Sequence, residues 1–159
     1  TENESFNKKG IDDITFLIST NKGESLKPLS KIASGGEISR IMLSFKRILS
    51  ESDNIDSLIF DEIDTGISGQ TALVVAKQMW ELSKNHQIMA ITPLPQIAAM
   101  GETNYVIKKD IKGDKPFVRL NEEEKVNELV RIISGESIGD NAFMYAKDMF
   151  ENAEKSKNS

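Results

Sequence analysis

The sequence predicts an α/β fold in which a mostly parallel sheet is flanked by helices and followed by a β-hairpin and C-terminal helices. Short apolar runs of strand length alternate with longer segments of helical periodicity. Two of these runs, at residues 57–60 and 87–91, are separated by a helical segment, which is the order of a parallel β-α-β crossover. The 159 residues are enough to bury a core, so we expect one domain over residues 1–159.

The N-terminal part is expected to hold a lead-in, one strand and the strongest helix. Thr1 to Gly10 is polar and lacks periodicity, whereas the alternation around Phe16 predicts a partly buried strand over residues 14–18. From Ile38 to Leu49, apolar residues recur at helical spacing with basic residues between them. This pattern predicts an amphipathic helix.

The remaining elements are expected in the order strand, helix, strand, hairpin and two helices. The first strand is 57–60, the helix covers 72–82, and prolines close the second strand, 87–91. Residues 105–108 and 117–120 flank a Lys-Gly-Asp-Lys turn and predict the hairpin. Helices are expected at 123–134, with Asn121 and Glu124 as a capping pair, and at 141–153, before a frayed tail from Glu154.

Composition excludes several classes of function. The chain has no cysteine and one histidine, so a disulfide framework is excluded and a zinc site built from these residues is improbable. No apolar run approaches the ~20 residues of a membrane span. The formal net charge of −5 argues against a broad DNA-binding surface, so the lysines of the predicted hairpin are more simply solvated charges.

A short motif precedes the strongest helix. Ser34 can cap that helix, and Glu37 would complete a capping box. Between them, Gly35 and Gly36 are poor helix formers, which is understandable if a ligand must approach the backbone. The free N–H groups of a helix start attract anions such as phosphate. A plain helix start remains an equally good reading of these four residues alone.

Two carboxylates end the first apolar strand. Asp61 and Glu62 stand at the carboxyl edge of the predicted sheet, where α/β proteins place ligands. Neighbouring residues of a strand point to opposite sides, so the two cannot do the same work. One could hold Mg²⁺ on a nucleotide and the other could polarise an attacking water. Two exposed acids at a strand end are the alternative.

Two further segments follow strands. Asp64 to Gly69 contains an acid, hydroxyls and glycines, which suggests a shaped loop, although a plain connection would look similar. Thr92 and Pro93 follow the second strand, where a switch residue could reach a γ-phosphate. Composition alone favours a proline-terminated strand there.

In this order and spacing the four segments resemble the ATPase heads of the ABC and SMC type. Ser34 to Glu37 resembles the signature motif, Phe60 to Glu62 the Walker B motif, Asp64 to Gly69 the D-loop, and Thr92-Pro93 the switch loop. The resemblance implies the C-terminal lobe of a P-loop ATPase head that binds ATP and Mg²⁺. It further implies that the signature acts in trans on a second head, in an ATP-dependent dimer.

The resemblance also implies the individual roles. Ser34, Gly35 and Gly36 would close over the γ-phosphate, and Glu37 would be the fourth nucleotide-binding residue of the signature. Asp61 would hold Mg²⁺ with the nucleotide, and Glu62 would be the catalytic residue. Asp64 would tie the two sites together across the dimer.

Residues 27–43, 59–70 and 94–98 resemble more closely the RecN family of bacterial DNA double-strand-break repair ATPases. That likeness implies a cytoplasmic, nucleoid-associated protein, with DNA as a partner of the full-length protein and no membrane.

Two departures from the family pattern stand out. No G-x-x-x-x-G-K-[ST] phosphate loop occurs in this sequence, and the family's switch histidine falls on Pro93. In the family the phosphate loop lies in an N-terminal lobe beyond a long coiled coil. We therefore expect a fragment of the head that is inactive alone. A transporter nucleotide-binding subunit or a non-hydrolysing interaction module are the alternatives, and Pro93 is the best support for the module.

Overall fold

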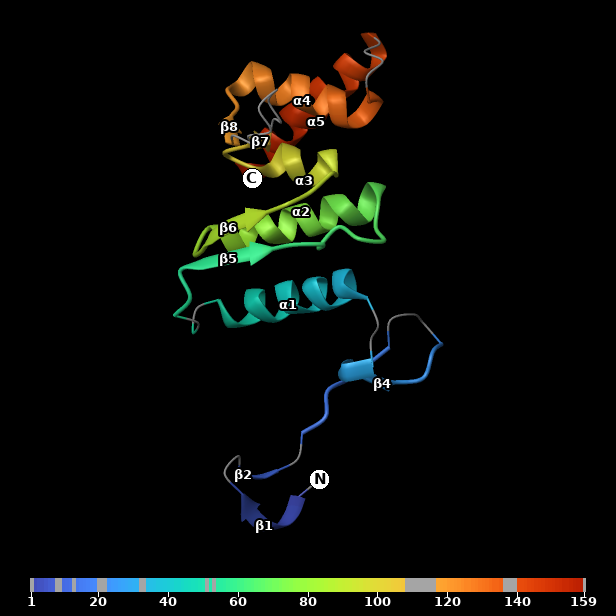
Figure 1. Cartoon of the computed structure of the whole chain (residues 1–159), viewed down its shortest axis with the longest axis vertical. Helices are drawn as coiled ribbons and strands as arrows, with labels where there is room; N and C mark the ends of the chain where they lie inside the picture. The colour runs from blue at the N-terminus through green and yellow to red at the C-terminus, as the bar shows by residue number, and fades with distance from the viewer. Residues whose placement is uncertain are drawn as a thin grey trace, which may run out of the picture.

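The structure is a computed structural model, and it is organised around one parallel crossover. Strand β5 (Ser57–Phe60), helix α2 (Gly69–Ser83) and strand β6 (Gln87–Ala90) follow one another, and the strands pair in parallel with Ser57 beside Gln87 and Phe60 beside Ala90. The predicted crossover is confirmed (Figure 1). The residues that the structure describes are 2–7, 10–12, 14–19, 23–31, 34–50, 52, 54–107, 117–135 and 140–158.

Helices build the core on one side of this strand pair. Helix α1 (Gly35–Leu49) packs on α2, and α3 (Pro95–Met100) packs on α2 and on the C-terminal helices α4 (Glu122–Ser134) and α5 (Asp140–Lys157), as Figure 1 shows. Ile63 and Leu82 are fully buried at its centre. Leu58 and Ile88 pack against this core from the inner face of the strand pair.

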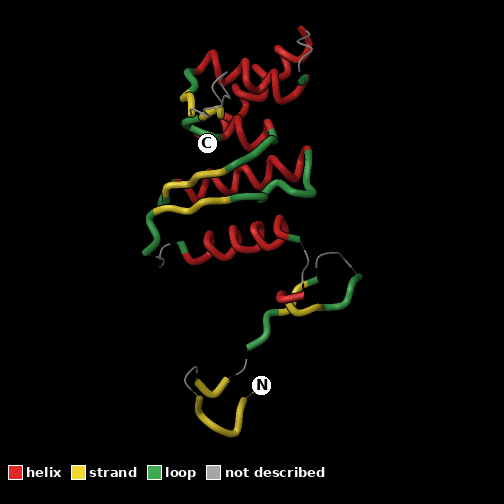
Figure 2. Tube along the Cα trace, in the orientation of Figure 1, coloured by secondary structure: helices red, strands yellow, loops and turns green. Residues whose placement is uncertain are grey.

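The other strand pairs among the described residues, drawn in yellow in Figure 2, are antiparallel. Strands β7 (Tyr105–Ile107) and β8 (Phe117–Arg119) confirm the predicted hairpin, although its turn and lysines 108, 109, 112 and 115 lie outside the described residues. Two further pairs are β1 (Glu2–Asn7) with β2 (Gly10–Asp12), and β3 (Leu17–Ile18) with β4 (Lys27–Pro28), which a 3-10 turn (Leu29–Lys31) follows.

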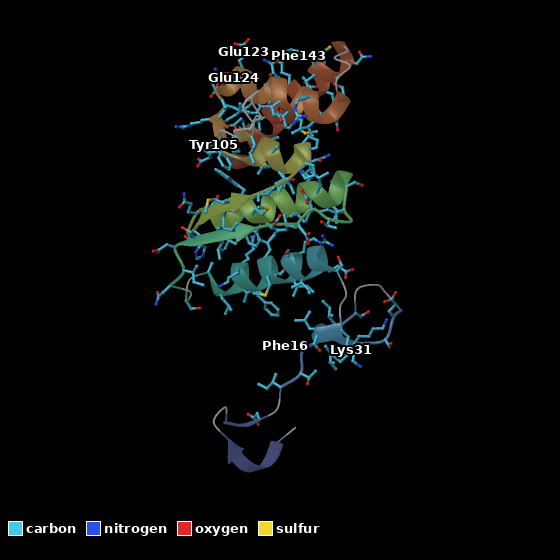
Figure 3. The ribbon with its side chains drawn as sticks, viewed as in Figure 1. Phe16, Lys31, Tyr105, Glu123, Glu124 and Phe143 are labelled. Atoms are coloured by element: carbon cyan, nitrogen blue, oxygen red, sulfur yellow. The ribbon has the colours of Figure 1, made fainter. Side chains whose placement is uncertain are left out.

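The N-terminal segment differs from the prediction. The expected lead-in contains β1, and the expected partly buried strand at 14–18 is reduced to Leu17–Ile18. Phe16 is 61% exposed (Figure 3). Its ring packs edge-to-face with that of Phe45 on α1, with the ring centres 5.9 Å apart. No second layer covers this strand among the described residues, so its alternating pattern gains little burial.

The C-terminal helices confirm the predicted capping pair of α4 and continue beyond the predicted end of α5. The side chain of Asn121 accepts from Glu124 N at 2.9 Å, and Glu124 accepts from Asn121 N at 2.9 Å. The predicted frayed tail from Glu154 is wrong, because α5 continues to Lys157. The Lys157 ammonium pairs with Glu154 and lies 5.5 Å from the centre of the Trp80 ring, which holds the last turn against α2.

One face of the β5–β6 pair carries apolar side chains that this chain leaves open. Ile59 is 69% exposed, Met89 44% and Ile91 66%. Their neighbours Leu58, Phe60 and Ile88 face the core. Residues of a strand alternate between faces, so both faces of this pair are apolar, which is typical of strands buried on both sides. Among the described residues, no helix is long and apolar enough to cross a membrane.

Candidate functional site

The first turn of α1 is capped but open to solvent. Ser34 has extended backbone angles, and its Oγ accepts a hydrogen bond from Glu37 N at 3.4 Å. The serine half of the predicted capping box is therefore formed. The hydroxyl proton of Ser34 remains available to donate to a ligand, because a hydroxyl can accept and donate at once.

The two glycines of this turn are placed differently. Gly36 is buried, and a Cβ added there would lie 2.8 Å from Thr65 O and 2.9 Å from Glu62 O. Gly35 is exposed, and a Cβ there would come within 2.6 Å of one atom, the Glu62 Oε2. Gly36 is thus required by the protein's own loop. Gly35 is the position at which an external group can reach the backbone.

The carboxylates after β5 meet this turn. Asp61 and Glu62 are both exposed, and Asp61 Oδ1 accepts from Glu62 N at 2.9 Å. Glu62 has a φ of 56°, in the left-handed region that residues with a side chain rarely adopt. This backbone twist sends the Glu62 carboxylate to Gly35, so the structure brings the predicted phosphate turn and the predicted water-activating acid together.

The loop that directly follows Glu62 places its first two side chains in the protein interior. Ile63 is fully buried and Asp64 is 9% exposed. Thr92 Oγ1 donates to Asp64 Oδ2 and accepts from Leu94 N at 3.0 Å, so Thr92 joins this loop to the start of α3. Pro93 beside it is exposed. The Asp64 side chain is therefore bound within its own lobe, and its contact across a dimer stays a prediction.

Two residues of this cluster were not predicted from the sequence. Ser39 Oγ donates to Asp61 O at 3.2 Å, and Arg40 Nη1 donates to Ile63 O at 3.0 Å and to Thr65 O at 2.8 Å. In the sequence they look like the polar side of an amphipathic helix. The signal that could have found Ser39 and Arg40 is their spacing. They lie one helical turn after Gly36 and one turn before Leu43, and Gly36 and Leu43 are both buried.

The charges of the site are mainly negative. Glu37 lies in the first turn of α1, and Asp61 and Glu62 follow β5, while Arg40 on the next turn of α1 is bonded to carbonyl oxygens. Among the described residues, no group of three or more acids or histidines could hold a metal ion by itself. One exposed carboxylate such as Asp61 still suits Mg²⁺ that arrives on a nucleotide, because that ion keeps waters and phosphates as its other ligands.

The fold has a solved counterpart. A structure from a study of ATP-driven dimerisation and DNA-stimulated activation of SMC ATPases superposes with a TM-score of 0.54, covering 72% of this chain and 70% of that one at 23% sequence identity. This chain therefore shares its α/β fold with that structure over most of both chains.

Sequence comparison defines the family. The chain is 44% identical over 153 residues to the DNA repair protein RecN of Bacillus subtilis, and 40% identical over 143 residues to RecN of Vibrio cholerae. These matches cover 94% and 88% of the chain. No protein-family model matches it. The chain belongs to the RecN family, and it spans about a quarter of the length of these curated relatives, 27% and 26%.

Proposed function

We propose that this lobe supplies one half of a composite ATP site in a RecN-like ATPase that acts in DNA double-strand-break repair and recombination. The observation that carries the proposal is the meeting of three features at one edge of the lobe. These are the open turn at Ser34 and Gly35, the exposed carboxylates of Asp61 and Glu62, and the Asp64–Thr92 bond behind them.

Each residue has a proposed role. Ser34 and the N–H groups of Gly35 and Gly36 bind the γ-phosphate of an ATP held by a second head, with Glu37 beside them. Asp61 would hold Mg²⁺, which would supply charge neutralisation at the phosphates. Glu62 orients the attacking water and accepts its proton. Thr92 keeps the switch loop against Asp64, and Pro93 stands where the family has its histidine.

The charge of the site explains why half of it is insufficient. At either composite site a triphosphate would meet acids of this lobe, Glu37 at the turn or Asp61 and Glu62 after β5. Arg40 is engaged by Ile63 O and Thr65 O. Phosphoryl transfer depends on positioning and on charge stabilisation, so a phosphate loop with its lysine must come from elsewhere. We therefore expect no measurable ATPase activity from the 159-residue chain alone, and robust turnover by a purified preparation would contradict this.

Three partners follow from this proposal. The open apolar face at Ile59, Met89 and Ile91 is suited to an N-terminal lobe carrying the phosphate loop. A second head completes each ATP site. Because this chain has a net charge of −5, DNA is engaged mainly by other parts of the full-length protein. The protein acts in the cytoplasm, at the nucleoid.

The decisive test uses Glu62→Gln in the full-length protein. Glutamine keeps the size of the side chain but cannot accept the proton of the water, so turnover should fall by at least about 100-fold. ATP-bound dimers should accumulate on gel filtration. The control is Glu81→Gln, since Glu81 is exposed on α2 and pairs only with Lys84 among the described contacts. If Glu62→Gln hydrolyses ATP like the wild type, Glu62 is not the catalytic residue.

One observation favours a second function. Pro93 is exposed at the switch position and has no side-chain donor for a γ-phosphate, as expected for an interaction module that binds nucleotide without hydrolysing it. In that case wild-type full-length protein dimerises with ATP but releases no phosphate, and Glu62→Gln changes nothing. The similarity to RecN argues against the alternative that the chain is a transporter subunit.

A further inference from the structure

The first two turns of α1 hold the loop after β5 through its carbonyl oxygens. Ser39 Oγ bonds Asp61 O at 3.2 Å, while one nitrogen of Arg40 bonds both Ile63 O at 3.0 Å and Thr65 O at 2.8 Å. Gly36 packs against Glu62 O and Thr65 O from the same helix. Four carbonyls of a five-residue loop, residues 61–65, therefore face α1.

This loop needs external support. Glu62 adopts a left-handed φ of 56°, and such a backbone persists only where its surroundings hold it. Inside the loop, Thr65 N donates to Glu62 O at 3.0 Å and Ile67 N to Asp64 O at 3.3 Å. These bonds close local turns but do not fix the loop relative to the phosphate-binding turn. Arg40 does so, because its charged donor holds two carbonyls on either side of Asp64.

We propose that Arg40 is a positioning residue for Glu62, and that it couples the two ATP sites of a head dimer. This inference rests on the proposed function. The turn at Ser34 and Gly35 would contact a phosphate held by the other head, whereas Glu62 would act on the nucleotide of its own head. Arg40 lies on the helix that begins at that turn and bonds the loop that carries Glu62, so a shift of α1 on phosphate binding moves the catalytic carboxylate.

The test compares Arg40→Met and Arg40→Lys with the wild type in the full-length protein. Methionine keeps most of the aliphatic stem and removes both bonds, whereas lysine keeps a charged donor able to reach one carbonyl or both. Misplacement of a reacting group by about 1 Å can cost about 100-fold in rate. For Arg40→Met we expect kcat to fall by about 10- to 100-fold with KM for ATP within about threefold, and cooperativity in ATP to be lost. Arg40→Lys should restore part of kcat and of the cooperativity.

The matched control is Arg47→Met on the same helix. Arg47 bonds Gln78 on α2 and lies two turns beyond Arg40, so its loss should leave kcat and cooperativity unchanged. Hydrogen exchange of the amides in residues 61–67 supplies a second readout, and it should accelerate in Arg40→Met but not in Arg47→Met.

The two proposals fail differently. A wild-type protein without turnover overturns the proposed function and this inference with it. If the wild type hydrolyses ATP and Glu62→Gln does not, a normal kcat in Arg40→Met overturns the positioning role alone. If Arg40→Met and Arg40→Lys lower kcat equally and both keep the cooperativity in ATP, Arg40 only stabilises the fold and the positioning role is overturned. Should Arg40→Met fail to fold, Arg40→Lys and Ser39→Ala must each lower kcat and cooperativity, and normal values in both overturn the role.

Discussion

The two adjacent glycines at the start of α1, Gly35 and Gly36, should respond in opposite ways to the same substitution. At Gly36, an alanine Cβ would lie 2.8 Å from Thr65 O and 2.9 Å from both Glu62 O and Thr65 Cβ, whereas ordinary contacts begin at 3.4 Å. The loop must retreat by about half an ångström, and overpacking of this kind costs about 1–3 kcal/mol. Alanine regains at most about 1 kcal/mol in helix propensity. We expect Gly36→Ala to lower the free energy of unfolding by about 1–2 kcal/mol.

Gly35→Ala is the matched control for that loss. Its Cβ meets only Glu62 Oε2, the end of a flexible exposed side chain that can rotate away. Stability should stay unchanged or rise by up to about 1 kcal/mol. In the full-length protein, however, the same methyl group displaces the Glu62 carboxylate and obstructs the phosphate turn, so ATP turnover should fall.

The free energies of unfolding of both variants are measured by urea unfolding of the chain, followed by the fluorescence of its single tryptophan, Trp80. For a chain of this size a loss of 1 kcal/mol lowers the Tm by about 2–4 °C, so Gly36→Ala should lower it by about 2–8 °C. Equal losses of stability in the two variants would refute the division of roles between the glycines. Full stability of Gly36→Ala would refute the close packing of the loop.

Three further substitutions test other contacts. Asn121→Ala removes the capping box of α4 and should cost about 1 kcal/mol in urea unfolding, whereas Glu123→Ala in the same exposed first turn (Figure 3) should cost a few tenths. Thr92→Val leaves the buried Asp64 without its hydroxyl donor and should cost about 1–3 kcal/mol by thermal denaturation, and a change below about 0.5 kcal/mol would show that the bond is unimportant. Ile59→Lys should leave the stability of this chain within about 0.5 kcal/mol, because the side chain is 69% exposed. In the full-length protein it should open the head to limited proteolysis, since the charge would be buried, and equal resistance of variant and wild type would argue against a lobe on this face.

The sequence predicted the elements that are specified locally. Helices α1, α2 and α4 were predictable because their apolar residues recur at helical spacing, and the box of Asn121 and Glu124 because its two bonds join residues three apart. The parallel pairing of β5 and β6 followed from the intervening helix, since such crossovers are stereotyped.

Features decided by distant parts of the chain were not predictable. Arg40 reaches residues 63 and 65, and no local pattern distinguishes it from a solvated arginine of an amphipathic helix. The strand around Phe16 shows a typical alternation, yet without a covering layer the pattern yields little burial. The last turn of α5 looked polar enough to fray, but Trp80 on α2 provides a platform for Lys157.

The segment of Thr92 and Pro93 makes structural contacts that do not depend on the side chain at position 93. Thr92 donates to Asp64 and accepts from Leu94 N, just before α3, so it fixes the loop that follows Glu62. None of this needs the next side chain, and Pro93 is exposed with no donor to offer. Substitution at Pro93 should therefore leave the loop geometry intact and change only what reaches a phosphate. We propose that, if the protein hydrolyses ATP, the turn at Ser34 and Gly35 senses the γ-phosphate. Arg40 would then link the helix that begins at this turn to the loop that carries Glu62, through its bonds to Ile63 O and Thr65 O.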